Sequence, residues 1–356
     1  MYNMKATFLA IWMLLSTYSV TAWADGHPRW QMLPDGSIEW VTNKQLPHND
    51  HIEMSGKQVS VVLRYGVNES GAFVLNKSMI WPLLRTIPNN THASLMRRFD
   101  WNPLDVITLN GRTMTGEKVN KIRLKGMLTV ESSYDNGWYG QYKLIREYLP
   151  STELPALVEN YTLINTGKSP ISIEIPVMEN KLSTDPQKGV EGSYRIEMTT
   201  DKNGYFTIAS GDTLSFSASI VGYRPGQPTL AIDGQQEKQK RLALVDAWMN
   251  RLVLETPDPI IDRMFAFSKI RACESIYATQ GGPMHGPGGE SYYAAIWAND
   301  QAEYINPYFP FTGYEYGNSS ALNSFKHFAR FMNKEWKPIP SSIVAEGLDI
   351  WNGAGD

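Results

Sequence analysis

The segment QQEKQKRLALVDAWMNR, residues 235–251, divides the chain into two parts of different character. Its Gln, Glu, Lys and Arg residues favour helix, and its apolar residues recur at helical spacing. We therefore predict a linker helix within residues 236–256. The sequence before this segment has the pattern of strands and the sequence after it has the pattern of helices, so the predicted order is β first and α second.

The residues before the linker alternate apolar and polar side chains in short runs, as β-strands do. The clearest runs are Val59–Leu63, Ile122–Val130, Trp138–Leu149, Leu157–Ile164, Ile171–Val177, Tyr205–Ile208 and Leu214–Val221. Groups of Asn, Asp and Gly, which favour turns, separate them at residues 68–71, 110–111, 135–137, 165–167 and 203–204. About ten strands in this stretch predict one large antiparallel β-sandwich within residues 25–235.

After the linker, apolar side chains recur at three- and four-residue steps, which predicts helices. The first helix is expected to have Asp258 as its N-cap and Pro259 at its first position, and to extend to about Thr279. A second helix is expected to begin after Ser319 or Ser320 as the cap.

This helical part is short. Two or three amphipathic helices cannot cover one another's apolar stripes, because each stripe needs another layer against it. We therefore expect residues 257–356 to be the start of a larger helical domain that is truncated here.

The first residues have the features of a secretory signal peptide. Lys5 supplies a positive charge, an apolar run follows, and Ala22-Trp23-Ala24 provides the small residues that signal peptidase recognises. The apolar run is shorter than the roughly 20 residues that cross a bilayer. We expect residues 1–24 to be removed and the mature protein to be periplasmic or secreted, with no membrane partner after cleavage.

The composition narrows the class of ligand. The formal net charge is −3, from 33 basic and 36 acidic residues without long runs of one sign, which argues against nucleic acid as a partner. A single cysteine, Cys273, excludes an internal disulfide, so a hydrophobic core must stabilise the fold. The 11 Trp and 18 Tyr residues are typical of sugar-binding surfaces, although large aromatic residues also fill cores.

A second informative stretch follows the first predicted helix. It reads GGPMHGPGGE at 281–290, YYAAIWANDQAEY at 292–304 and NPYFP at 306–310. With the β-then-α order, it resembles the six-hairpin glycosidases, relatives of glucoamylase, trehalase and α-rhamnosidase. The resemblance implies an N-terminal antiparallel β-supersandwich, a linker helix and the first hairpins of an (α/α)6 barrel. Asn299 stands where those families usually have an Arg.

The resemblance also implies that Asp300 enters a sugar pocket, either as the general acid or as a carboxylate that binds sugar hydroxyls. Inverting glycosidases hold two catalytic carboxylates about 6.5–9.5 Å apart, so Glu303 is expected to lie too close to Asp300 to be the second one. The next candidates for the acid are Glu346 and Asp349, and the remaining carboxylate is expected beyond Asp356. The expected substrate contacts are aromatic, amide, carboxylate and imidazole side chains around Asp300: Trp297, Asn299, Tyr293, Glu303, Glu290 and His285.

Two segments of the sandwich are further candidates for the pocket rim. Trp81 begins the polar stretch WPLLRTIPNNTH, and His51 lies in HNDHIE, residues 48–53. The second segment has two His and two carboxylates, but no Cys and no third ligand at the spacing of a zinc site, so a solvated turn is the simpler interpretation. We expect neither a metal nor a cofactor.

Three functions compete. The favoured one is an exported glycoside hydrolase that cleaves an oligo- or polysaccharide by acid/base chemistry with paired carboxylates. A glycoside phosphorylase has the same domain order, but it uses cellular phosphate, which the predicted signal peptide argues against. If the chain ends at Asp356, a non-catalytic carbohydrate-binding or surface glycan protein is the third alternative.

Overall fold

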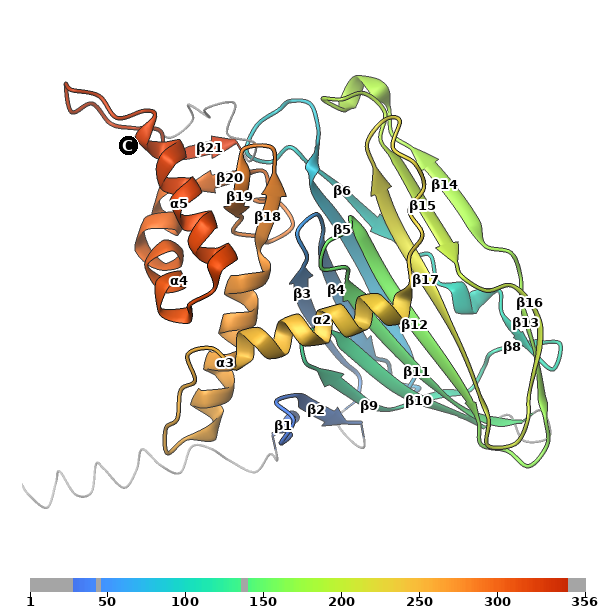
Figure 1. Ribbon diagram of the computed structural model, residues 1–356. Coiled ribbons are helices and arrows are strands. Elements are labelled where there is room, and N and C mark those ends of the chain that lie inside the picture. The colour runs from blue at the N-terminus through green and yellow to red at the C-terminus, as the bar shows by residue number, and fades with distance from the viewer. Residues whose placement is uncertain (1–27, 43–45, 136–139, 345–356) are drawn as a thin grey trace, which may run out of the picture.

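The computed structural model describes residues 28–42, 46–135 and 140–344. The predicted signal peptide and the candidates Glu346 and Asp349 lie outside these residues. The described chain forms a β-sandwich up to Tyr223, followed by helices that gather beside it (Figure 1).

The larger layer of the sandwich is a nine-stranded antiparallel sheet in the order β1-β2-β9-β10-β11-β12-β17-β15-β14. Burial alternates along its central strands, for example along β10, because successive side chains point to opposite faces. The strands are β1 (Gln31–Met32), β2 (Ile38–Val41), β9 (Glu117–Leu124), β10 (Leu128–Asp135), β11 (Gln141–Pro150), β12 (Ala156–Asn165), β14 (Glu179–Ser183), β15 (Arg195–Thr200) and β17 (Thr213–Tyr223).

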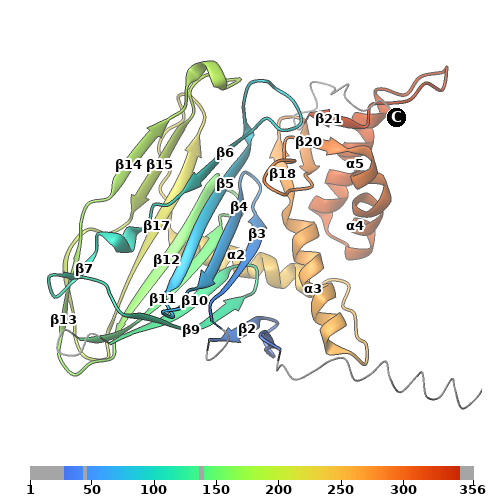
Figure 2. The same cartoon turned by 180° about the vertical axis from the view of Figure 1, so that it is seen from behind.

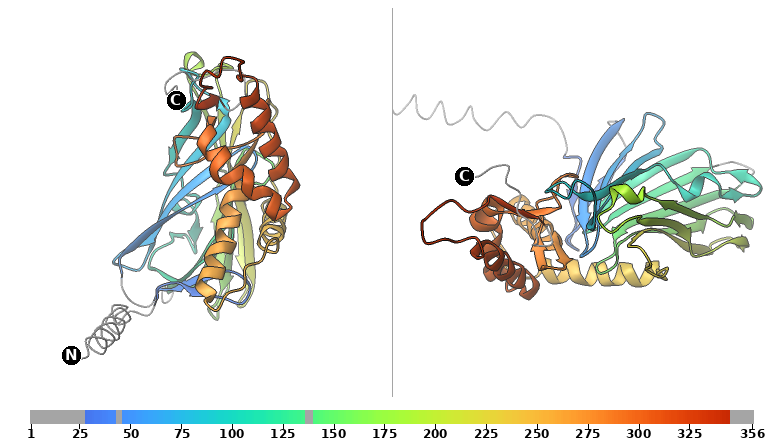
Figure 3. Two further views of the ribbon diagram at one scale, coloured as in Figure 1. Left: turned by 90° about the vertical axis from the view of Figure 1, so that its left-hand side faces the viewer. Right: turned by 90° about the horizontal axis from the view of Figure 1, so that it is seen from above.

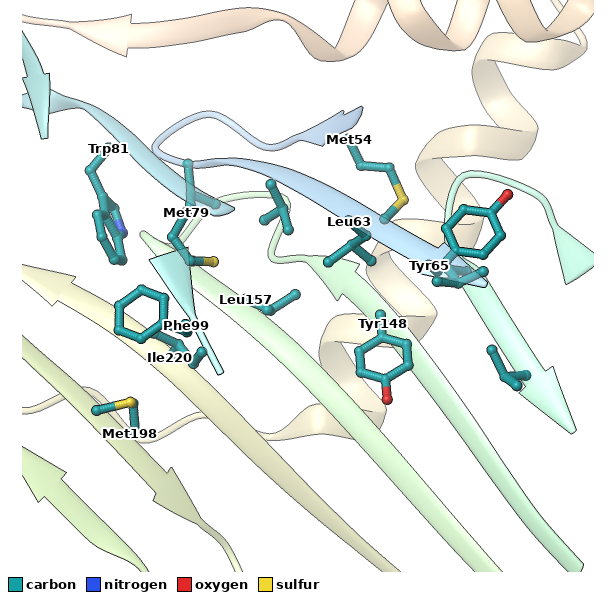
Figure 4. Packing of buried hydrophobic residues seen from close by; sticks show 14 of the residues in the cluster. Met54, Leu63, Tyr65, Met79, Trp81, Phe99, Tyr148, Leu157, Met198 and Ile220 are labelled. Carbon is teal, nitrogen blue, oxygen red and sulfur yellow. The ribbon is translucent and has the colours of Figure 1, made fainter. Parts of the chain in front are cut away.

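The second layer is divided into two four-stranded antiparallel sheets, ordered β3-β4-β5-β6 and β16-β13-β7-β8 (Figure 2). Each packs its own apolar cluster against the large sheet. Figure 4 shows part of the first cluster, in which Trp81, Met79 and Leu63 face Leu157 and Ile220. The strands are β3 (His48–Ser55), β4 (Ser60–Val67), β5 (Phe73–Arg85), β6 (Ser94–Phe99), β7 (Thr108–Leu109), β8 (Arg112–Thr113), β13 (Ile171–Ile175) and β16 (Gly204–Ile208).

The predicted antiparallel sandwich is thus confirmed. The expected number of about ten strands is too low, because the described residues up to Tyr223 form β1 to β17, and one predicted run is wrong. The run Ile122–Val130 is two strands, because the chain reverses at Gly126 between β9 and β10. Gly126 has a φ of +65°, and a Cβ there would lie 2.2 Å from Val245 Cγ2. Only glycine suits both the turn and the close approach of the next helix.

That helix, α2 (Gly234–Met249), lies across the outer face of the large sheet (Figure 3). Asp233 caps it by accepting hydrogen bonds from the backbone of Gln235 and Gln236, both at 3.0 Å. Leu242 packs on Met127, Leu149 and Val158 of the sheet. The helix therefore joins the two parts of the chain by packing on the first.

The next helix, α3 (Pro259–Glu274), has the predicted N-cap Asp258 and the predicted Pro259 at its first position. Its predicted extension to Thr279 is wrong, since β18 (Ile276–Thr279) turns back through β19 (Gly282–His285). Two apolar runs separated by Gln280 and Gly281 form a hairpin here.

Five further elements complete the described helical part. They are β20 (Ala295–Trp297), the π-helix η4 (Asp300–Ile305), α4 (Asn306–Thr312), α5 (Glu315–Ala329) and β21 (Ser342–Val344), which pairs with β20. The predicted serine cap of α5 is wrong: the helix begins at Glu315, after Gly313 ends α4 with a φ of +61°, and Ser320 is buried inside it. Within the described residues, helices that combine the length and the apolar character needed to cross a membrane do not occur.

Candidate functional site

The loop between β19 and β20, residues 286–294, lies on the outer face of the β3–β6 sheet. Arg85 is buried and donates a hydrogen bond of 2.8 Å to the Ala294 carbonyl. The Tyr293 hydroxyl donates to Glu53 Oε1 at 2.8 Å, and the backbone N–H of Gly289 donates to Glu53 Oε2 at 3.2 Å. A Cβ at Gly288 would lie 2.5 Å from Glu53, so glycine lets the loop approach this carboxylate.

Glu53 also ends a chain of charged groups that links the sandwich to the helices. Arg271 of α3 pairs with Glu53 at 2.5 Å and with Glu274 at 2.6 Å. Glu274 in turn pairs with the fully buried Arg241 of α2. Although burial opposes its charge, the Glu274 and Glu53 carboxylates raise the pKa of Arg271. Arg271 therefore stays charged, and the network holds α2, α3, β3 and the loop together.

Glu290, at the end of the glycine-rich loop, is held by arginines of the sheet. Its Oε2 lies 2.6 Å from Arg64 and 3.5 Å from Arg98. The hydrogen bond from Arg64 is the main reason that its pKa is lowered to about 2. Because Glu290 is ionised at neutral pH and engaged by both arginines, it fastens the loop to the sheet, whereas the expected role was a substrate contact.

Three predicted sugar contacts are buried: Trp81 is 0% exposed, Tyr293 1% and His285 6%. They therefore lack the accessible ring face that stacking on a sugar requires, and these predictions are corrected. The Trp81 indole donates to the Pro155 carbonyl at 2.9 Å. Burial lowers the pKa of His285 to about 3, and its Nδ1 finds no hydrogen-bond partner among the described residues.

His51 is exposed on β3, which is a strand rather than the expected turn. Neither it nor other residues of the described ranges belong to a group of three or more His, Cys, Asp or Glu that is placed to hold a metal ion.

The remaining predicted residues lie together in sequence at the surface of the helical part. Trp297 ends β20 and is half-buried, and its ring meets the ring of Tyr292 edge-on at 5.7 Å. Tyr292 is exposed and also contacts the His92 ring of the β5–β6 connection, at 4.8 Å. Asn299 is exposed as well. This surface thus offers aromatic rings and a polar amide to a ligand.

Asp300 opens the π-helix η4 and is half-buried, whereas Glu303 is exposed. The Tyr304 hydroxyl donates a hydrogen bond to Asp300 Oδ1. Burial raises the pKa of Tyr304 to about 12, so the hydroxyl keeps its proton. Within the π-helix, Tyr304 and not Glu303 contacts the Asp300 carboxylate. π-Helical turns are frequent at functional sites.

Sequence reasoning missed three contributors: Glu53, Tyr292 and Tyr304. Tyr304 follows Asp300 by four residues, which is a helical spacing and was a readable signal. Glu53 lies in the segment considered for a metal, but its partners Arg271 and Tyr293 are far along the chain. Its role is therefore not readable from local pattern.

Comparison with known proteins finds a likeness in structure but no match by sequence. No protein-family model matches the sequence, and no curated protein sequence matches it. The structure is similar to a solved structure described as "Putative kojibiose phosphorylase from human microbiome", with a TM-score of 0.54 and 9% sequence identity. The likeness covers 88% of this chain and 52% of that one, so this chain spans about half of its length. At this identity the likeness shows a related fold.

Proposed function

We propose that this chain provides the β-sandwich and the first helices of a six-hairpin carbohydrate-active enzyme. The enzyme hydrolyses glycosidic bonds of an oligo- or polysaccharide outside the cytoplasm. The observation that carries this proposal is the surface at Trp297 and Asp300, where an aromatic pair and an oriented carboxylate lie three residues apart in the sequence. The fold related to that of a described phosphorylase supports the enzyme class.

Within this proposal, Asp300 binds sugar hydroxyls. The hydrogen bond from Tyr304 fixes the orientation of its carboxylate, and an oriented carboxylate accepts strong hydrogen bonds from ligand hydroxyls. Trp297 and Tyr292 offer apolar faces to the sugar ring, and Asn299 offers an amide. Glu346 and Asp349 remain the proposed candidates for proton transfer.

Phosphorolysis is the second candidate function, and the description of the similar structure favours it. The two reactions differ in the group that attacks the anomeric carbon, which is water in a hydrolase and inorganic phosphate in a phosphorylase. The predicted signal peptide supports hydrolysis, because phosphorolysis uses phosphate inside the cell.

The test uses the polypeptide encoded by the complete reading frame that contains this chain. It is incubated with α- and β-linked disaccharides, with and without inorganic phosphate, and the products are separated. We expect free sugars at a rate that does not depend on phosphate. Sugar phosphate that forms only with phosphate present would establish the phosphorylase instead, and binding without any cleavage would favour the non-catalytic alternative.

Export is tested separately by sequencing the N-terminus of the protein recovered from the periplasm or the medium. We expect a mature N-terminus near Asp25. A protein that stays in the cytoplasm with Met1 intact would remove the argument against phosphorolysis.

A further inference from the structure

A pocket of about 500 Å³ lies inside the sandwich, away from the Trp297–Asp300 surface. It is formed at the division of the second layer, where the chain passes from β6 to β7 and β8. The inner face of the large sheet provides its floor through Glu117, Tyr134, Arg146 and Tyr148. Trp101 packs against the apolar clusters on both sides of this division.

Charged groups separate the two apolar clusters at this place. Lys77 is 3% exposed and pairs at 2.7 Å with Glu159, which is 1% exposed. Arg146 is buried to the same degree as Lys77 and pairs at 2.6 Å with Glu117. Withdrawing an ion pair from water costs several kcal/mol per ion unless other polar groups solvate it. Protein groups supply part of this solvation, since Lys77 also donates to the Trp101 carbonyl at 2.5 Å, and the pocket beside the two pairs gives room for further polar groups.

The pocket also has aromatic walls and a polar rim. The rings of Phe73 and Tyr148 stack at 6.2 Å, and burial keeps the pKa of Tyr148 above its usual value, so its hydroxyl remains a neutral hydrogen-bonding group. The rim consists of exposed polar side chains: Asp100, Asn102, Asp105 and Thr113. Ligand pockets in proteins have volumes of roughly 300–1,000 Å³ and combine such apolar walls with a few placed polar groups.

The charges indicate which ligand this pocket accepts. Two basic residues, Lys77 and Arg146, and three acidic residues, Asp100, Asp105 and Glu117, line it. Both basic groups are already paired with carboxylates, so they do not offer an uncompensated charge to an anion. Hydroxyl groups, in contrast, donate to carboxylates and accept from guanidinium and ammonium groups without adding charge.

We propose that this pocket is a second ligand site, which binds a neutral polyhydroxylated molecule of the size of a mono- or disaccharide. It is separate from the Trp297–Asp300 surface. Lys77 and Ser78 are successive residues of β5 and point to opposite faces: Lys77 inward to Glu159, and Ser78 outward to Arg64, which holds Glu290. The pocket and the loop at residues 286–294 therefore occupy opposite faces of one sheet, and the pocket proposal does not depend on the proposed enzyme activity.

The experiment compares two surface threonines. Thr113 lines the rim, whereas Thr115 is exposed nearby and is not part of the pocket lining. The probes are glucose, galactose, mannose, xylose, maltose, cellobiose, lactose and sucrose, screened by saturation-transfer NMR and titrated by calorimetry against the 356-residue chain. We expect at least one to bind, Thr113→Trp to weaken it by about tenfold or more, and Thr115→Trp to leave it within about twofold.

The proposal is overturned if no probe binds, or if Thr113→Trp and Thr115→Trp behave alike. Tighter binding of inorganic phosphate or choline than of every sugar would also contradict it. If Thr113→Trp does not fold, Asp105→Ala, an exposed change at the rim, tests the same point, and unchanged sugar binding by this variant would count against the proposal.

Discussion

The sandwich and the helical part differ in how they bury their apolar side chains. The sandwich encloses two clusters between its layers, and residues such as Leu157 are 0% exposed. The helical part leaves large apolar side chains at its surface, among them Leu322 of α5, which is 61% exposed. The first part therefore encloses its own core, whereas the second exposes apolar side chains of the kind found at interaction surfaces.

Buried polar contacts, as well as apolar packing, join the two parts. Arg241 donates hydrogen bonds of 2.7 Å to the Gly126 carbonyl and 2.8 Å to the Ser55 carbonyl while pairing with Glu274. One side chain of α2 thus contacts the turn between β9 and β10, the end of β3 and α3. This guanidinium adds to the apolar packing between the two parts, in which Tyr277 and Tyr293 contact the sheet.

The largest expected effect follows from removing that guanidinium. Arg241→Met leaves part of the buried Glu274 carboxylate and two backbone carbonyls without their donor, so we expect a loss of about 3–5 kcal/mol in the free energy of unfolding. Urea unfolding followed by circular dichroism measures it. Gln239→Met, an exposed change on the same helix, serves as the control. Equal stability of the two variants would show that the link is not structural.

A matched pair of leucines measures the difference in core quality directly. Leu157→Ala in the sandwich should cost about 2–5 kcal/mol, because it leaves a cavity in a closed core. Leu322→Ala in α5 should change stability by about 0.5 kcal/mol or less, as exposed sites do. The denaturation midpoints of the two variants measure these losses. A similar loss of stability at both positions would mean that α5 is covered in solution.

The loop at residues 286–294 should respond to a single hydroxyl group. Tyr293→Phe removes the donor to Glu53 and should cost about 1.5–3 kcal/mol, the range for hydrogen bonds to charged groups. We expect faster proteolysis within residues 286–291 as well. Tyr292→Phe, at an exposed ring, should change neither quantity. If the loop of Tyr293→Phe is cut no faster than in the unchanged protein, Glu53 does not hold it.

Lowering the pH should reduce the stability of the helical part, by less per pH unit than the buried substitutions above. The pKa of His285 is lowered from 6.5 to about 3 by burial, so the unfolded chain takes up a proton that the folded chain does not. The contribution of neutral His285 to the free energy of unfolding is complete above pH 6.5. It is lost as the pH falls toward 3, at about 1.4 kcal/mol per pH unit. His285→Gln should flatten this slope and the exposed His51→Gln should not, as melting temperatures between pH 7 and 5 will show. Identical slopes in all three proteins would rule out His285 as the cause.

Local pattern predicted much of the sandwich and less of the site. The turn signal at Asn110-Gly111 is confirmed, with both residues at positive φ, because the residue types that allow this conformation are few. Alternation continued through Gly126, so the hairpin there was read as one strand. Trp81 was misassigned because an indole serves equally in a core and on a sugar-binding surface.

The site depends on contacts between distant segments. The pair Arg271–Glu53 joins residues 218 positions apart, and sequence pattern carries no information about such a pair. The π-helix at Asp300 was also unforeseen, since it differs from an α-helix in hydrogen bonding rather than in composition. Asp300 itself was identified through the resemblance to six-hairpin glycosidases, and its function remains a proposal.

The measurement that tests this assignment most directly is the activity of Asp300→Asn in the polypeptide of the complete reading frame. Glu315→Gln, at an exposed position of α5, is the control. It is assayed on glycosides with good and poor leaving groups, together with the melting temperature. If Asp300 binds sugar hydroxyls, kcat/KM should fall by about 10–100-fold for both substrates, since binding in the transition state is weakened equally. A larger loss, confined to poor leaving groups, would make Asp300 the general acid. An unchanged kcat/KM with an unchanged melting temperature would contradict the account and remove Asp300 from the site.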